Sequence, residues 1–142
     1  MMLANLLSAE QIIPEMQAGE RWQAIEEIIN RLVEAGRISA KDKPSVLAAL
    51  KQREETMSTG IGFGIAIPHA SSDCVADVVA GFGRSRPGIE FDSLDNQPVH
   101  FIESSTGFSS RSTVTRSVSP GFRVSSILRT FTISALEVTG IP

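Results

Sequence analysis

The segment STGIGFG, residues 58–64, holds three glycines in five residues and limits most strongly how this chain can fold. Glycine alone adopts positive φ angles readily, so the segment predicts a loop with unusual backbone freedom. The apolar residues 65–67 follow at once and end at Pro68, which indicates the end of a buried strand. Pro68 also stiffens the backbone directly before His69.

Two helices are predicted before this segment. From about residue 20 to residue 35, apolar residues recur at spacings of three and four, with charged and amide residues opposite, as in an amphipathic helix. Gly36 follows at a position where a helix end favours a left-handed residue. A second helix opens at Pro44, which suits a first helical turn, and ends near residues 53–56. Arg53 is therefore expected in its last turn.

Strands are predicted after the glycine-rich segment. The pattern favours strands over residues 75–83 and from residue 99 onward. Turns are expected at residues 86–88 (Arg-Pro-Gly) and 95–97 (Asp-Asn-Gln). Because helices and strands are interleaved, the expected class is α/β, with helices covering a mixed sheet.

Composition narrows the function classes. The 142 residues suit one domain, and the formal net charge of −3 argues against a nucleic-acid or polybasic membrane-surface protein. No apolar run approaches the roughly 20 residues of a membrane helix, and no signal peptide is expected. One cysteine, Cys74, excludes an internal disulfide, and two histidines make a metal site improbable. We expect a cytoplasmic location and no metal or other cofactor.

The composition changes sharply at about residue 103. Residues 104–134 contain 10 Ser, 5 Thr and 4 Arg but no Lys, Asp or Glu. Too few residues follow for an independent core. We therefore predict one domain over residues 1–103 and an atypical, poorly ordered tail over residues 104–142.

The segment from Arg53 to Ala70 resembles the phosphorylation-site region of the type-2 enzyme IIA family (fructose, mannitol and nitrogen-related) of the bacterial phosphotransferase system. That family's pattern fixes an acidic or amide residue and then, after six free positions, a block of apolar and small residues around a Pro-His pair. This chain fills the fixed positions with Glu54, Ile61, Gly62, Ile65, Ala66, Ile67, Pro68, His69 and Ala70. Residues 8–14 and 83–99 also resemble the family, the latter its nitrogen-related branch. The likeness covers about residues 6–102.

The resemblance implies a three-layer α/β/α domain with a mixed sheet and helices on both sides. It implies that His69 accepts a phosphoryl group from a histidine-containing phosphocarrier protein and passes it to an enzyme IIB or acts on a regulated partner. Neutral imidazole is a good nucleophile near pH 7. Arg53 has the spacing, sixteen residues before His69, of the family's arginine that stabilises the phosphoryl charge. Thr59 is a candidate hydroxyl donor to the phosphoryl group.

Each of these residues also has a structural interpretation. Arg53 could simply be a cation that stabilises a helix end, and Thr59 could only cap or shape its loop. His100 lies in a strand pattern between apolar neighbours, where a structural role is favoured. Trp22 is expected to be a core residue of the first helix.

The chain departs from the family after residue 102. The family's second active-site histidine, some 45 to 50 residues after the first, has no counterpart in residues 114–119, and no Leu-rich helix follows. A shift of reading frame near Ile102 and a divergent tail are two explanations. The resemblance of residues 83–99 favours a regulatory carrier of the nitrogen-related branch. The alternatives are a fructose- or mannitol-specific enzyme IIA and an inactive product lacking the C-terminal part of the site.

Overall fold

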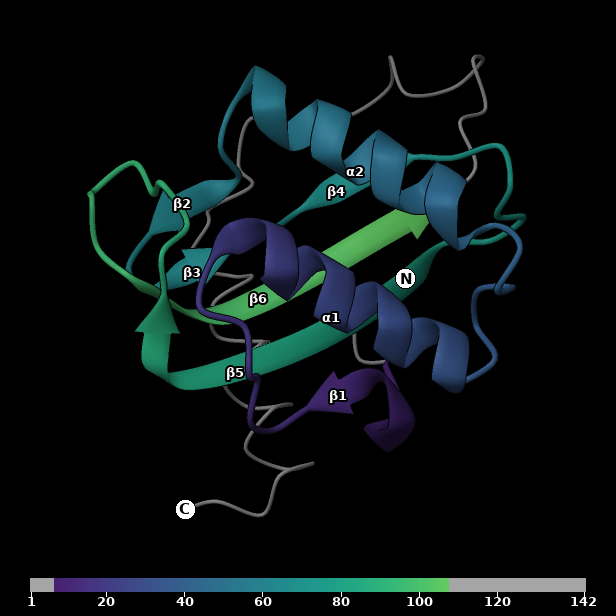
Figure 1. The fold of residues 1–142 in the computed structure, drawn as a ribbon, viewed down its shortest axis with the longest axis horizontal. Coiled ribbons are helices and arrows are strands. Elements are labelled where there is room, and N and C mark those ends of the chain that lie inside the picture. Colours follow the sequence, from purple (N-terminus) through teal and green to yellow (C-terminus); the bar gives the residue numbers. More distant parts are fainter. Residues whose placement is uncertain (1–6, 108–142) are drawn as a thin grey trace, which may run out of the picture.

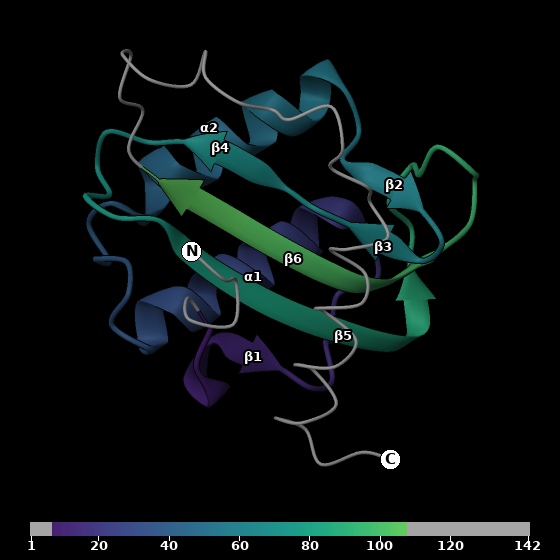
Figure 2. The same ribbon diagram turned by 180° about the vertical axis from the view of Figure 1, so that it is seen from behind.

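The computed structural model describes residues 7–107. A mixed sheet forms one layer, and two helices, α1 (Arg21–Glu34) and α2 (Lys43–Thr56), cover the same face of it. Figure 2 shows the sheet from the other side, with both helices behind it. The predicted α/β class and mixed sheet are confirmed. Within residues 7–107 no helix covers the other face of the sheet, so the helical layer expected there stays a prediction.

Both helices lie where the sequence predicts them (Figure 1). The Glu20 side chain caps α1 by accepting hydrogen bonds from the backbone N–H groups of Trp22 and Gln23. Gly36 follows the helix at φ +71°, which a residue with a Cβ rarely adopts. In α2, Pro44 lies in the first turn and Arg53 in the last, as predicted.

The sheet has its strands in the order β1-β5-β6-β3-β2, and β4 also pairs with β6. The strands are β1 (Ile12–Ile13), β2 (Gly60–Gly62), β3 (Ile65–Ala66), β4 (His69–Ser71), β5 (Val79–Ile89) and β6 (Val99–Gly107). β3 and β4 follow each other along one edge of β6, both parallel to it, whereas β5 runs antiparallel on its other edge. β6 is thus the central strand against which the segment around His69 is aligned.

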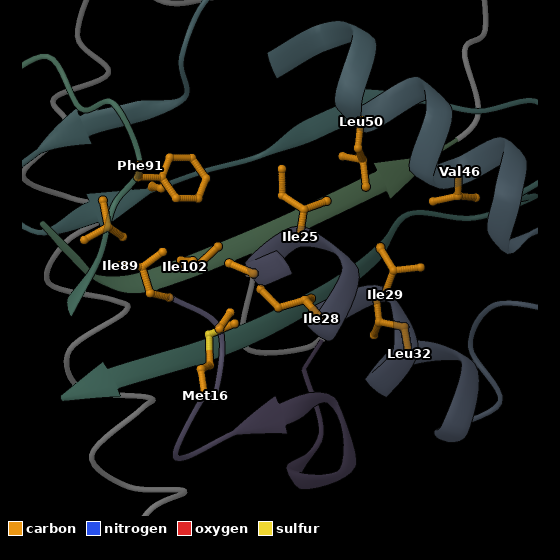
Figure 3. Close-up of a cluster of buried hydrophobic side chains, with 14 of the residues drawn as sticks. Met16, Ile25, Ile28, Ile29, Leu32, Val46, Leu50, Ile89, Phe91 and Ile102 are labelled. Carbon is orange, nitrogen blue, oxygen red and sulfur yellow. The ribbon is translucent and has the colours of Figure 1, made fainter. Parts of the chain in front are cut away.

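The core lies between this sheet and the two helices (Figure 3). Ile25, Ile28, Ile29 and Leu32 of α1 are almost fully buried and pack with Val46 and Leu50 of α2 and with Ile89, Phe91 and Ile102. Trp22 is partly buried against this cluster, as expected. Burial on this scale is the main stabilising contribution to the fold.

Three local predictions were wrong. The strand expected over residues 75–83 begins only at Val79. Residues 86–88 form no turn, because β5 continues through them. Gly88 adopts φ +89° and the β5–β6 register shifts between Arg84 and Ile89, so a bulge absorbs Pro87, which has no N–H to donate. The glycine-rich segment is also more than a loop. Its residues 60–62 form β2, which pairs antiparallel with β3 in a tight hairpin.

The boundary expected at residue 103 lies inside β6. Ser104–Gly107 continue the strand and pair with β5 and with β4. Strand pairing uses backbone groups, which the change to Ser and Thr leaves intact. The rest of the expected tail, residues 108–142, lies outside the described residues.

Candidate functional site

His69 is the first residue of β4 and its side chain is exposed. Its Nδ1 atom lies 2.8 Å from the carbonyl oxygen of Ile67. A carbonyl oxygen can only accept a hydrogen bond, so Nδ1 carries the proton of the neutral ring. The lone pair is then on Nε2, which makes no hydrogen bond to another residue in the described range 7–107. The geometry presents Nε2 as the nucleophilic atom.

The backbone around His69 is fixed from two sides. On one side, the Ile67 N–H donates to the carbonyl of Thr59 at 3.1 Å, which ties the segment to the start of the hairpin. On the other, the Ser105 N–H donates to the carbonyl of Pro68 at 3.0 Å, and His69 itself is in register with Ser105 on β6. An exposed side chain thus stands on a rigid backbone, as a precise reacting group requires.

An open hollow of about 570 Å³ lies between the last turns of α2 and the ends of β4 and β6. His69 and Arg53 both line it, so the structure brings together two of the three predicted site residues. Its other lining residues are Ala49, Gln52, Thr56, Ala70, Ser71, Val78, Ser105, Thr106 and Gly107. Arg53 is the charged member of this set, which contains no carboxylate. The hollow therefore suits an anion.

Arg53 makes the helix-ending contact considered for it from the sequence, and it also lines the hollow. Its Nη1 atom donates to the carbonyl of Met57 at 2.9 Å, beyond the end of α2, as a helix-ending cation would. A guanidinium has five N–H donors in a fixed fork, and this bond uses one of them. The remaining donors are available to the hollow.

Thr59, the third predicted site residue, does not line the hollow. It is buried, and its N–H and hydroxyl both donate to the carboxylate of Glu54, at 2.9 Å and 2.6 Å. A hydroxyl that donates to a buried carboxylate cannot also donate to a group on His69. The structural interpretation, that Thr59 shapes its loop, is the one the geometry supports.

Glu54 fills the acidic or amide position of the pattern, next to Arg53, and has a structural role in this chain. Its side chain is almost fully buried and holds the segment after α2 through both bonds to Thr59. Neighbouring positions on a helix point about 100° apart, so Arg53 can line the hollow while Glu54 points inward. In the sequence, Glu54 is visible as a fixed position of the pattern, but its contact with Thr59 is not.

The polar residues of β4 and β6 were not predicted as part of the site. Ser71, Ser105 and Thr106 line the hollow, and two of them lie beyond residue 103, where we expected the domain to end. Ser71 follows His69 by two residues, a spacing that places both on one side of a strand. No local pattern could have shown which β6 residues lie beside His69, because register depends on long-range pairing.

The other titratable groups near β6 have structural surroundings. The Nδ1 atom of His100 lies 2.9 Å from the carbonyl oxygen of Ser85, in keeping with the structural role expected for it. Burial without a charged partner raises the pKa of Glu103 from 4.5 to about 7. Glu103 stands opposite Phe82 of β5, in a different register position from the residues of the hollow.

Residues 7–107 hold neither a metal-binding cluster nor a membrane-spanning helix. No three His, Cys, Asp or Glu side chains in this range lie close enough together to hold a metal ion. In the same range, neither helix has the length and apolar character that a membrane span requires.

Residues 5–105 match the family described as "Phosphoenolpyruvate-dependent sugar phosphotransferase system, EIIA 2". The chain belongs to this family. The fructose-specific EIIA component of Haloferax volcanii is 37% identical over 100 residues, which are 70% of this chain and 64% of that protein. The nitrogen regulatory protein of Bradyrhizobium diazoefficiens is 29% identical over 102 residues, 72% of this chain and 65% of that protein. The matched part thus spans slightly under two thirds of each of these relatives.

Solved structures agree with the EIIA 2 assignment. Nitrogen regulatory protein IIA-Ntr from Neisseria meningitidis has a TM-score of 0.67 and 29% identity, over 75% of this chain and 71% of that one. The Escherichia coli complex of enzyme IIA and phosphorylated enzyme IIB for mannitol has a TM-score of 0.65 at 22% identity, over 93% of this chain and 95% of that one. At that identity the likeness shows the fold alone. Both the nitrogen-regulatory and the sugar-specific branches are therefore represented among the proteins similar to this EIIA 2 chain.

The family match extends past the residues on which the resemblance rested. It contains Arg53, Thr59 and His69 and ends at residue 105, two residues before β6 does. Ser105 is thus the last matched residue, while Thr106 and Gly107, which also line the hollow of this EIIA 2 domain, lie beyond the match.

Proposed function

We propose that this chain is a phosphoryl carrier that accepts a phosphoryl group on Nε2 of His69 from the phosphohistidine of a phosphocarrier protein. One observation carries the proposal. The family's Pro-His motif holds an exposed imidazole with Nδ1 fixed by the Ile67 carbonyl, and this ring shares a hollow with Arg53. Membership of the EIIA 2 family supports the same reaction class.

The transfer balances without an external acid or base. The Nε2 lone pair of His69 forms a bond to phosphorus while the P–N bond of the donor histidine breaks, and the donor nitrogen keeps that electron pair. The proton on Nδ1 stays in place, so the product is a phospho-imidazolium whose N–H still donates to Ile67. Such transfer depends chiefly on positioning and on compensation of the oxygen charge.

Arg53 would supply that compensation. Its guanidinium stays protonated at any physiological pH and can donate to two phosphoryl oxygens at once. The bond to Met57 fixes the side chain at the end of α2, beside the hollow. In this proposal Thr59 does not touch the phosphoryl group but holds the loop through Glu54.

The onward acceptor depends on the branch. A sugar-specific enzyme IIA would pass the group to an enzyme IIB, and the mannitol enzyme IIA with the same fold forms a complex with phosphorylated enzyme IIB. A nitrogen-related one would control a regulated partner through its phosphorylation state. Residues 83–99 favour the regulatory branch by resemblance, whereas the identity of 37% to a fructose-specific relative favours the sugar branch. Either function implies a cytoplasmic protein.

The contacts of residues 83–99 make this segment weak evidence for either branch. In this segment Ile89 and Phe91 are core residues, and the Asp95 carboxylate accepts from the Phe63 N–H at the hairpin tip. None of its residues lines the hollow. The segment therefore reports on how the hairpin packs rather than on which partner approaches His69.

The test is phosphoryl transfer from labelled phosphoenolpyruvate through the two general carriers of the system. We expect label on the unmodified chain and on His100→Ala, a control that removes the other histidine, and none on His69→Ala. Label retained by His69→Ala would remove the central claim. A chain that takes no label at all would instead support the inactive product. Phosphorylated chain offered to an enzyme IIB then separates the branches, because only the sugar-specific one should lose its label.

The tail has its own test. We propose that the family likeness ends because the reading frame shifts near Ile102. Reading the coding DNA in the other two frames after codon 102 should then yield an apolar strand, a histidine and a Leu-rich helix. If neither frame does, the tail is a divergent one.

A further inference from the structure

Ser105 is the residue on β6 that lies beside His69. The two residues are register partners across the parallel β4–β6 pair. Adjacent strands lie about 4.8 Å apart, and partners in register project to the same side of a sheet. The Ser105 N–H also donates to the carbonyl of Pro68, which fixes the two backbones against each other. Ser105 thus has a defined place next to the imidazole.

Ser105 is half-buried and lines the hollow, and its hydroxyl makes no hydrogen bond to another side chain or backbone group of residues 7–107. The other hydroxyl on that side of the sheet, Ser71, is exposed and follows His69 along β4. Thr106 also lines the hollow, but it is the register partner of Ala70, not of His69, and its hydroxyl is almost fully buried and unpaired. Of these three hydroxyls, Ser105 is the one that is fixed, accessible and free.

The hollow needs such a donor. A phosphoryl group presents three oxygens that share negative charge, and Arg53 is the only cation among the lining residues of the described range. A forked guanidinium reaches two oxygens at most when one of its donors is bound to Met57. Neutral hydroxyl donors on the β6 side would serve the oxygen that faces away from α2.

We propose that Ser105 binds the phosphoryl group on His69, its hydroxyl donating a hydrogen bond to a phosphoryl oxygen. The inference rests on the proposed function, adds a residue that the sequence pattern does not fix, and concerns this chain whichever origin its tail has. No bond is made or broken at Ser105, and its proton stays on the hydroxyl. Its effect is to hold the phosphoryl group against rotation and against attack by water.

The test uses phosphoramidate, a small-molecule phosphoryl donor, so that no partner protein's docking enters the result. In that reaction the P–N bond of the donor breaks, ammonia leaves and the bond to Nε2 forms. We compare the unmodified chain with Ser105→Ala, Ser105→Thr and Ser45→Ala. Ser45 is an exposed hydroxyl on α2 outside the hollow and serves as the control. Phosphorus NMR follows both the formation and the hydrolysis of the phosphohistidine.

We expect Ser105→Ala to form phosphohistidine more slowly and lose it faster, together by about tenfold, which is the size of one charge-assisted hydrogen bond. Ser105→Thr, which keeps the hydroxyl, should behave like the unmodified chain, as should Ser45→Ala. A Thr variant as poor as the Ala variant would overturn the proposal, because the loss would then come from strand packing. Rates equal to those of the unmodified chain in Ser105→Ala would overturn it as well.

These outcomes separate the inference from the function beneath it. An unmodified chain that takes no phosphoryl group on His69 overturns both. A chain that is phosphorylated on His69 but indifferent to Ser105 overturns this inference alone.

Discussion

Two groups of buried polar side chains near His69, the Glu54–Thr59 pair and the hydroxyls at the end of β6, differ in their hydrogen bonding. On the side of the hairpin, the buried carboxylate of Glu54 accepts from the N–H and the hydroxyl of Thr59. On the side of β6, the buried hydroxyls of Ser104 and Thr106 have no partner, and Glu103 pairs in register with Phe82. Unpaired buried polar groups cost stability, whereas paired ones fix a structure. The comparison indicates that the Glu54–Thr59 pair fixes the loop before His69, whereas the unpaired hydroxyls at the end of β6 weaken the fold.

Removing the Glu54 carboxylate, the acceptor for Thr59, should lower the free energy of unfolding most. Glu54→Ala leaves both the N–H and the hydroxyl of Thr59 buried without an acceptor, so we expect a loss of about 3 kcal/mol in the free energy of unfolding. Urea denaturation measures it, with Glu55→Ala, an exposed neighbour on α2, as the control. A loss of less than about 0.5 kcal/mol would mean that the paired carboxylate does not stabilise this region.

The carboxyl of Glu103 offers a second test through pH. Its pKa in the folded state is raised to about 7, above the unfolded value of 4.5, because burial disfavours the charge. The folded state then binds the proton more tightly, so the stability that this group contributes is complete below pH 4.5 and is lost as the pH rises through about 7. The loss is at most about 3 kcal/mol, since one pKa unit corresponds to about 1.4 kcal/mol.

Denaturation at a series of pH values compares the unmodified chain with Glu103→Gln. The variant should gain on the unmodified chain between pH 4.5 and 7 and keep a constant advantage above that range. Glu55→Gln should run parallel to the unmodified chain. Parallel curves for Glu103→Gln would show that the carboxyl is not destabilised on β6 and would weaken the contrast with Glu54.

The tight fit of the hairpin is the third point to test. A Cβ on Gly60 would lie 2.9 Å from the Cα of Ser93, a backbone atom that cannot move aside. We expect Gly60→Ala to cost about 2 kcal/mol by overpacking. Gly19→Ala, where a Cβ would meet nothing within 4 Å, is the matched control and should be nearly neutral. Equal effects of the two changes would show that the close approach of Ser93 to Gly60 does not cost stability when a Cβ is added.

The same contrast separates what the sequence could predict from what it could not. The helices followed from apolar periodicity, and the positions of Arg53 and His69 followed from a motif in one continuous segment. The bulge at Gly88 and the role of Ser105 depend on pairing between β6 and strands far away in the sequence. The sequence suggests Thr59 as a hydroxyl donor to the phosphoryl group. In the folded loop its hydroxyl donates to Glu54 instead, and the sequence pattern does not show this contact.

The composition change at residue 103 misled for a related reason. It correctly marked where side chains stop suiting a buried strand, since Ser104 and Thr106 are buried without partners. It could not mark where the strand ends, because the backbone of Ser104–Gly107 still pairs with both neighbours. The sequence shows that the side-chain chemistry changes at residue 103. It does not show how far the strand extends, because strand pairing depends on the backbone.

Removing an unpaired hydroxyl from β6 should change the free energy of unfolding least, but it should increase it. Ser104 is fully buried opposite Gly81, near Ile28 and Leu32 of α1, and its hydroxyl has no partner. We expect Ser104→Ala to raise the free energy of unfolding by about 1 kcal/mol, because it removes an unsatisfied hydroxyl and leaves a methyl group in the same place. Most substitutions destabilise, so a gain is hard to obtain by accident.

The control is Ser105→Ala, at a half-buried position on the other side of β6. Its free energy of unfolding should stay within about 0.5 kcal/mol of the unmodified chain, which separates this stability effect from the proposed binding effect. If Ser104→Ala is destabilising instead, its hydroxyl makes a favourable interaction, and the contrast with the Glu54–Thr59 pair is lost.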